Sequence, residues 1–280
     1  EREDQDYHNS INYDQIRITP AAKAKAAKEG IDILAVHNRL TDTRIKMEDI
    51  EVAIREKPQP FSRIRQVIAD RMTSSAFGAP HFYVTVSVDV TDLLALRKEL
   101  KKEGRSNSLT EYIMKSVALT LAEFPVVNSV SDGKTTKWNS RINIGLAVDI
   151  KEALVVPVLK DVDKLSMAEL REITLELTTK ARNGKLLPDD MTGGTFTVSN
   201  MGMLNVENFT AIINPGESAI LAVSAAIPTP AVVGQEIAIR TLMKMTLSSD
   251  HRIIDGATAA RFINKLKNRL EDVELWRNMM

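Results

Sequence analysis

The fold of this chain is decided by the stretch from Met243 to Gly256, which has the sequence MKMTLSSDHRIIDG. Its first half alternates apolar and polar side chains, the pattern of a β-strand that turns one face to a core. After Gly256, apolar residues recur with helical spacing to about Leu270. The stretch therefore predicts a half-buried strand, a turn that carries His251, and a closing helix over residues 257–270.

Strand and helix patterns alternate outward from this stretch, beginning at Phe61. Helices are expected over 64–72 and after Thr91, and capping-box sequences at Ser108 and Ser166 open two more, to about Leu121 and Arg182. Further strands are expected over 81–90, 142–148, 154–159, 195–199, 219–223 and 237–247. These elements predict an α/β fold, with a mixed sheet and flanking helices.

A different organisation is expected for the first 60 residues. Residues 1–17 are polar and lack a hydrophobic period, so we expect a tail or linker. Two short helices, 21–29 and 47–56, with an irregular connection, indicate a small helical domain over 18–56. The sequence KPQP at 57–60 predicts a stiff linker, which leaves 61–280 as the large domain.

Composition excludes several classes of function. Lys plus Arg and Asp plus Glu each total 37, so there is no net basic field for nucleic acid or an acidic membrane. The chain has no cysteine and no apolar run long enough to span a bilayer, and we expect no metal. The chain begins at Glu1 without a starting Met or a signal-peptide pattern, so we expect a fragment or a processed form of a longer protein. The lack of cysteine is compatible with a reducing compartment, and we expect the cytoplasm, or the mitochondrial matrix in a eukaryote.

The candidate for chemistry is His251, at the end of the predicted strand. Histidine is suited to act as a general base near neutral pH, and a strand end holds such a group in a fixed place. A single histidine is nevertheless more often structural, and Asp255 before Gly-Ala-Thr is also a good helix N-cap. Residue type and position leave both interpretations open.

The sequence HRIIDG, from His251 to Gly256, resembles the signature His-x-x-x-Asp-Gly of the dihydrolipoamide acyltransferases of 2-oxo-acid dehydrogenase complexes. Other blocks resemble the same family in the same order: PFSRIRQVIADRM at 60–72, APHFY at 79–83, FPVVN at 124–128, NIGLAVD at 143–149 and GGTFTVSNMG at 193–202. The resemblance covers nearly all of 60–276. It implies a fold similar to chloramphenicol acetyltransferase and transfer of an acyl group between dihydrolipoamide and coenzyme A.

The resemblance also implies roles for four residues. His251 corresponds to the base that takes the proton of the attacking thiol, and Ser199 to the hydroxyl that stabilises the tetrahedral oxyanion. Asp255 resembles the structural carboxylate beside the histidine, and Arg97 an arginine that pairs with it. In the family, base and oxyanion donor come from neighbouring subunits of a homotrimer.

The acyl group and the partners follow from smaller blocks. Residues 202–215 resemble acetyl-transferring members that serve pyruvate or acetoin dehydrogenase, whereas Leu159–Asp163 resembles succinyl-transferring ones. We expect acetyl transfer, with a succinyl- or branched-chain-transferring member as the alternative. Coenzyme A is then a substrate, and the lipoyl group is carried on a domain absent from this chain. A non-catalytic structural component is the alternative from another class, but relatives of that kind generally lack the histidine.

The N-terminal and C-terminal segments support two further expectations, one on partner binding and one on assembly. Residues 19–33 and 44–50 resemble a peripheral subunit-binding domain, which binds dehydrogenase subunits, although the loop 38–43 lacks the usual glycines. The tail 270–280 stands where the family has an apolar segment that joins trimers into a cage. Leu275, Trp276 and Met279 are the side chains expected to dock on a neighbouring trimer.

Overall fold

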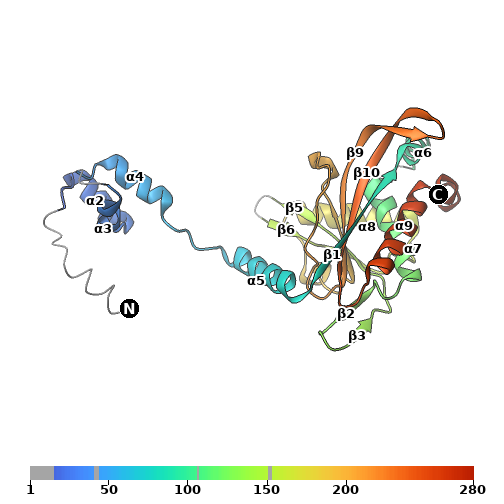
Figure 1. Cartoon of the computed structure of the whole chain (residues 1–280), viewed down its shortest axis with the longest axis horizontal. Coiled ribbons are helices and arrows are strands. Elements are labelled where there is room, and N and C mark those ends of the chain that lie inside the picture. The colour runs from blue at the N-terminus through green and yellow to red at the C-terminus, as the bar shows by residue number, and fades with distance from the viewer. Residues whose placement is uncertain (1–15, 41–43, 106, 151–152) are drawn as a thin grey trace. The chain divides into compact units, whose positions relative to one another are not determined.

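The computed structural model of the chain describes residues 16–40, 44–105, 107–150 and 153–280 (Figure 1). Residues 1–15 of the expected tail lie outside this range. The chain divides into two compact units, Glu1–Ser62 and Arg63–Met280. The division falls within two residues of the boundary expected between the linker and the large domain.

The described residues of the first unit form three helices, α2 (Pro20–Glu29), α3 (Ile33–Arg39) and α4 (Met47–Glu56). The two helices expected from the sequence are confirmed, and the Thr19 hydroxyl accepts a hydrogen bond from the Ala22 N–H at 3.4 Å. Helix α3 was not expected; the Asp32 carboxylate caps it by accepting from the Leu34 N–H. A small core holds the unit together and consists of Ile16, Ala22, Ala26, Leu34, Val36, Ile45, Ile50 and Ala53.

The second unit is built on a six-stranded sheet in the order β1-β10-β9-β8-β4-β7 (Figure 1). Its strands are β1 (His81–Asp89), β4 (Ile144–Leu146), β7 (Val158–Leu159), β8 (Phe196–Asn200), β9 (Ala219–Val233) and β10 (Glu236–Asp250). Strand β8 runs parallel to both β4 and β9, whereas the other pairs are antiparallel. The expected mixed sheet is therefore confirmed. Two short pairs lie outside it, β2 (Ser129–Ser131) with β3 (Thr136–Trp138) and β5 (Val148–Ile150) with β6 (Ala153–Val155).

The helices of this unit are α5 (Arg63–Gly78), α6 (Thr91–Lys102), α7 (Leu109–Glu123), α8 (Met167–Arg182), α9 (Gly256–Glu271) and α10 (Val273–Met279), with 3-10 turns at Pro188–Met191 and Gly202–Leu204. Both expected capping boxes form, at Ser108 and Ser166. Thr91 is the first residue of α6 rather than its cap. No helix in the described ranges is long and apolar enough to cross a membrane.

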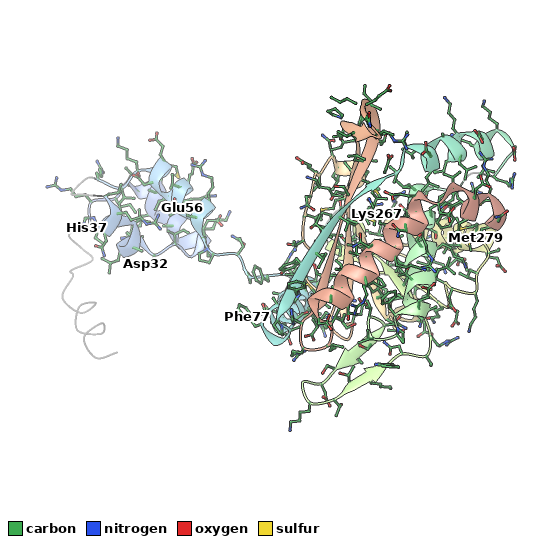
Figure 2. All side chains as sticks on the ribbon, turned by 45° about the vertical axis from the view of Figure 1, so that its right-hand side comes forward. Asp32, His37, Glu56, Phe77, Lys267 and Met279 are labelled. Carbon is green, nitrogen blue, oxygen red and sulfur yellow. The ribbon has the colours of Figure 1, made fainter. Side chains whose placement is uncertain are left out.

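Helix α5 differs from the others because it buries none of its residues within the chain. Ile64, Val67 and Phe77 are exposed, and Phe77, labelled in Figure 2, is 88% accessible. Ile68 and Met72 are half-buried. The half-apolar face predicted for this helix is present, but the chain itself supplies no core for it.

The two faces of the central sheet differ in chemistry. One face packs against α6 to α10 in a single core, to which β10 contributes Met243, Met245 and Leu247. Side chains alternate along each strand, so the intervening residues point to the opposite face. That second face, which we call the polar face, carries Tyr83, Thr85, Ser87, Thr197, Ser199, Ser224, Thr246 and Ser248.

A buried lysine fixes the entry to α8. Lys115 on α7 is 4% exposed, and its ammonium donates hydrogen bonds to the carbonyls of Val162, Asp163 and Leu165 at 3.2, 2.8 and 2.6 Å. Burial lowers the pKa of Lys115. The cation replaces the backbone donors that this irregular segment lacks, which ties it to the helical layer.

We expect Lys115→Met to lower the free energy of unfolding by about 3 kcal/mol or more, because three carbonyls lose their donor and each unsatisfied buried acceptor costs about 1–3 kcal/mol. Urea denaturation followed by circular dichroism measures the change. The exposed Lys98→Met on α6 is the matched control. Equal unfolding midpoints for both variants would contradict the proposed importance of these hydrogen bonds.

Candidate active site

Ser199 lies on the polar face of the sheet, near the end of β8. Its cross-strand neighbour is Ala222 on β9, which in turn faces Thr246 on β10. The residue is 8% exposed, and no described residue forms a hydrogen bond with its hydroxyl. A buried hydroxyl without a protein partner has its donor available for another group.

His251 follows the last residue of β10 and is exposed within the chain. Its backbone N–H donates to the carbonyl of Pro80 at 2.9 Å, which joins the turn to the segment before β1. Its ring packs edge-on against Phe82, with centroids 4.9 Å apart. A Cβ at Gly256 would lie 3.3 Å from the Phe82 ring, so glycine permits this packing. The imidazole is thus oriented by an aromatic neighbour.

The two residues that flank His251, Asp250 and Arg252, form an ion pair that was not expected from the sequence. Asp250, 3% exposed, accepts hydrogen bonds from the Arg252 backbone and from its guanidinium, whose Nη2 lies 2.6 Å from Oδ2. This contact raises the pKa of Arg252. The pair closes the turn around the histidine and limits its movement. The sequence signal is an Asp and an Arg two positions apart that flank the candidate base.

Within one chain, Ser199 and His251 do not come together. Ser199 is level with Thr246, whereas His251 lies beyond Asp250, four residues further along β10. Four residues extend roughly 14 Å along a strand, and the two intervening strand spacings add about 10 Å sideways. The two side chains are therefore roughly 15 Å or more apart, too far to act on one atom of substrate.

Asp255 and Arg97 also form their hydrogen bonds with different partners. Asp255 is the N-cap of α9: its carboxylate accepts from the Thr258 N–H at 2.7 Å, which lowers the pKa of Asp255. Arg97 on α6 donates through Nε to the carbonyl of Asn107 at 3.0 Å. No ion pair joins these two described residues. The expected pairing is not formed within one chain, because Arg97 ties α6 to the segment before α7.

One of the three side chains expected to dock on a neighbouring trimer is used within its own chain. Trp276 lies in α10, is fully buried in its own chain, and packs edge-on against Tyr112 with centroids 5.0 Å apart. The prediction that Trp276 docks on a neighbouring trimer is therefore wrong. The physical reason is that α10 folds back, so that the apolar tail covers the chain's own helices.

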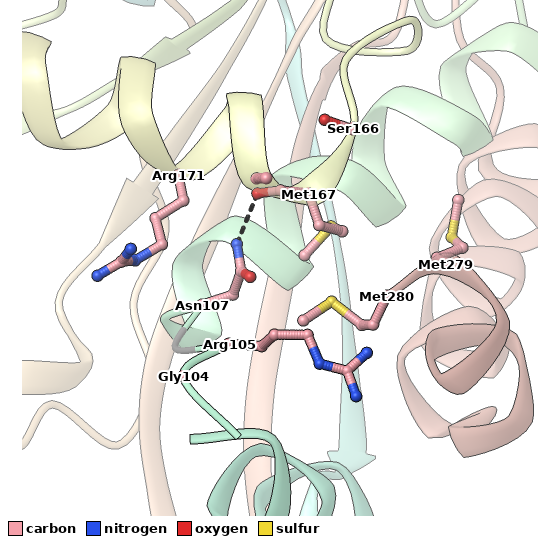
Figure 3. Close-up of a pocket in the computed structure, with 9 residues that line it drawn as sticks. Gly104, Arg105, Asn107, Ser166, Met167, Arg171, Met279 and Met280 are labelled. Atoms are coloured by element: carbon pink, nitrogen blue, oxygen red, sulfur yellow. Dashed lines mark hydrogen bonds between the residues drawn. The ribbon is translucent and has the colours of Figure 1, made fainter. Parts of the chain in front are cut away.

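A pocket lies between this tail and the start of α8 (Figure 3). Its lining includes Arg105, Asn107, Arg171 and Met280, and the Asn107 amide donates to the Met167 carbonyl at 2.8 Å. None of the four predicted site residues lines it. The pocket is separate from the candidate active site.

The mixed sheet with its flanking helices places this protein in the α/β class, and Ser199 on its polar face and His251 at its edge are the candidate catalytic groups. Residues 54–277 match the family described as 2-oxoacid dehydrogenases acyltransferase (catalytic domain). The chain belongs to this family, so the resemblance inferred from the sequence is confirmed.

Individual relatives agree with this assignment. The chain is 32% identical to the acetyltransferase component of the acetoin cleaving system of Bacillus subtilis, over 92% of this chain and 70% of the relative. It is 35% identical to the acetyltransferase component of the Zymomonas mobilis pyruvate dehydrogenase complex, over 92% of this chain and 65% of the relative. Among eight such relatives, the chain spans between 45% and 70% of their length.

Solved structures give the same result. A probable dihydrolipoamide acetyltransferase from Listeria monocytogenes has a TM-score of 0.74 and 36% identity, over 78% of this chain and 95% of that one. The cubic core of a pyruvate dehydrogenase multienzyme complex also has a TM-score of 0.74 and 36% identity, over 78% of this chain and 92% of that one.

The capping role of Asp255 yields a prediction. Asp255→Ala should lower the melting temperature by roughly 2–4 °C, the shift typical of one lost helix cap in a chain of this size. Asp255→Asn should keep the parent value, since the amide oxygen accepts the same hydrogen bond. Calorimetry distinguishes them; equal losses in both variants would show that the charge, rather than the cap, stabilises α9.

Proposed function

We propose that this chain transfers an acetyl group between dihydrolipoamide and coenzyme A as the core of a pyruvate or acetoin dehydrogenase complex. The observation that carries the proposal is the pair of available groups in a member of this family: the Ser199 hydroxyl lacks a partner among the described residues, and the His251 ring is exposed. A chain that had kept only a structural role would need neither group.

His251 takes the proton from the attacking thiol, and the resulting thiolate forms a carbon–sulfur bond to the acetyl carbonyl. The Ser199 hydroxyl donates a hydrogen bond to the oxyanion of the tetrahedral intermediate. The carbon–sulfur bond to the donor then breaks, and His251 returns the proton to the departing sulfur. Thiol exchange of this kind is balanced and needs neither an oxidant nor a further reactant.

The active site is shared between subunits. Because Ser199 and His251 lie roughly 15 Å or more apart in one chain, each site takes its histidine from one chain and its serine from the next. A homotrimer with three equal interfaces satisfies this requirement. The exposed apolar residues of α5, which find no core in their own chain, are consistent with burial against another subunit. Whether trimers join into a cage stays a prediction.

Acetyl is favoured as the acyl group because the acetoin and pyruvate relatives are named acetyltransferases. The partners we propose are lipoyl domains, which deliver the acyl group, and dehydrogenase subunits. We propose that the dehydrogenase subunits bind the first unit, because its sequence resembles a peripheral subunit-binding domain. The relatives include bacterial proteins and one named mitochondrial, in agreement with the cytoplasm or mitochondrial matrix as its place.

A thiol-release assay with dihydrolipoamide tests the reaction and the acyl group. We expect acetyl-CoA to give the highest kcat/KM, ahead of succinyl- and branched-chain acyl-CoA. His251→Ala should reduce kcat by about 10²-fold or more, since proton transfer by a positioned base contributes about 10²–10⁴. Preference for another donor would reassign the acyl group, and an equally active His251→Ala would remove the base from the mechanism.

Co-expression of two inactive chains tests the shared site. Ser199→Ala should lower kcat by about 10²–10³-fold. Mixed trimers with His251→Ala chains should regain activity, because some interfaces pair an intact histidine with an intact serine. At equal amounts with random assembly, about one interface in four is intact, so we expect about a quarter of the parent activity.

Two tagged copies of the same variant, co-expressed and purified identically, provide the control and should remain inactive. No gain in mixed trimers would contradict a site divided between chains.

A further inference from the structure

A buried carboxyl group lies behind the candidate oxyanion donor. Residues Asn214 to Glu217, with the sequence NPGE, form a turn closed by a hydrogen bond from the Glu217 N–H to the Asn214 carbonyl at 3.1 Å. Gly216 has φ +94°, which suits the third position of a type II turn with proline before it. This turn directs the Glu217 side chain inward.

Glu217 is 8% exposed, and one of its oxygens is fully engaged. Its Oε1 accepts hydrogen bonds from the Thr197 hydroxyl at 2.9 Å and from the Asn214 amide at 3.2 Å. Its Oε2 has no partner among the described residues. A Cβ at Gly194 would lie 3.2 Å from Oε1, so the absence of a side chain there leaves space for the carboxyl.

Burial raises the pKa of Glu217 to about 7, opposed by hydrogen bonds from Thr197 and Asn214 and by the charge of Arg71 on α5. The other titratable group tied to this segment is His81 on β1, whose Nε2 accepts from the Ile213 N–H at 3.0 Å. The Glu217 carboxyl is therefore mostly neutral in weakly acidic solution and becomes charged near neutral pH.

The segment around Glu217 connects to both candidate catalytic residues. Thr197 and Ser199 are two positions apart on β8, so their side chains share the polar face. On the other side, the carbonyl of Ser218 accepts from the backbone N–H of Asp250, the residue before His251. One turn thus contacts the strand that presents the serine and the turn that presents the histidine.

We propose that Glu217 is a positioning residue for acyl transfer: its hydrogen bond to Thr197 fixes the strand that presents the Ser199 hydroxyl to the oxyanion. This inference rests on the proposed function. Glu217 touches neither Ser199 nor the reacting atoms and acts through Thr197.

Ionisation changes this arrangement. The neutral carboxyl needs few partners, whereas a carboxylate has two oxygens that require donors, and Oε2 has none in the described structure. The hydrogen bonds from Thr197 and Asn214 favour the carboxylate, but the cost of its burial is larger. Above pH 7 this cost favours movement of the Glu217 side chain toward solvent or Arg71, which releases Thr197. Ser199 then loses its fixed position, and the catalytic rate falls while binding of the thiol substrates is retained.

The kinetic test compares the parent with Glu217→Gln, which preserves shape and the acceptor for Thr197 but does not ionise. At pH 8 about one tenth of a group with pKa 7 remains neutral, so the ratio of kcat for the variant to kcat for the parent should rise about tenfold from pH 6 to pH 8. KM for dihydrolipoamide should change less than twofold. Thr197→Val, which removes the connecting hydroxyl, should lower kcat at both pH values.

The exposed Glu172→Gln on α8 is the matched control and should follow the parent at every pH. A kcat ratio that stays constant from pH 6 to pH 8 would overturn the proposal, and so would a Thr197→Val variant with the parent kcat.

Thermal unfolding tests the ionisation of Glu217 without using the catalytic activity. Because the pKa of Glu217 is raised in the folded state, its contribution to stability is present below pH 4.5 and is lost as pH rises to about 7. The melting temperature of Glu217→Gln, relative to that of the parent, should therefore rise between pH 5 and pH 7.

This gain together with the kinetic change supports the proposal. The gain without a kinetic change overturns it and leaves a structural carboxyl only. A parent that transfers no acyl group overturns the proposed function and the positioning role together, whatever the thermal result.

Discussion

The register of three neighbouring strands is the constraint on which the rest of this structure depends. Strand β9 is paired on one side with β8, in parallel, and on the other with β10, in antiparallel orientation. This ladder sets Ser199 level with Thr246 and leaves His251 beyond the end of β10. A shift of one residue would turn the apolar side chains of β10 out of the core, so the separation of the two groups is fixed by the same packing that stabilises the fold.

Hydroxyl side chains gather on the polar face of the sheet. Ser224, Ser248 and Glu217 each have a buried oxygen without a partner among the described residues, and all three lie at this face or behind it. Unsatisfied buried polar atoms are uncommon in folded proteins and are costly. Other such atoms lie away from this face, for example on Ser116 of α7 and Trp276 of α10, so an unpartnered atom does not by itself mark a site. What distinguishes the two faces is that one carries hydroxyl side chains, whereas the other is apolar and packs against the helical layer that stabilises the fold.

Much of the fold could be predicted because its signals are local. Alternation at Met243, Met245 and Leu247 and the capping boxes at Ser108 and Ser166 all correspond to elements of the structure. The length of β9 could not be predicted, since Pro228 and Pro230 argue against a strand. These prolines are tolerated because β8 ends at Asn200, opposite Val223, and leaves that edge of β9 unpaired. Nothing local indicated the contact between Glu217 and Thr197, twenty residues apart, or the burial of Trp276.

The divided site that we propose would couple catalysis to assembly. A folded single chain has a stable core and an oriented histidine, yet Ser199, the oxyanion donor that we propose, lies far from that histidine. Any substrate that contacts both chains binds the assembled form more tightly than the separated one, and by mass action it stabilises the oligomer. The reverse follows by linkage: whatever strengthens the interface raises the affinity for such a substrate. On this proposal the exposed apolar side chains of α5 and the fixed distance between Ser199 and His251 serve one requirement. Burial of the α5 side chains in an oligomer would supply the neighbouring chain that a site formed by both residues needs.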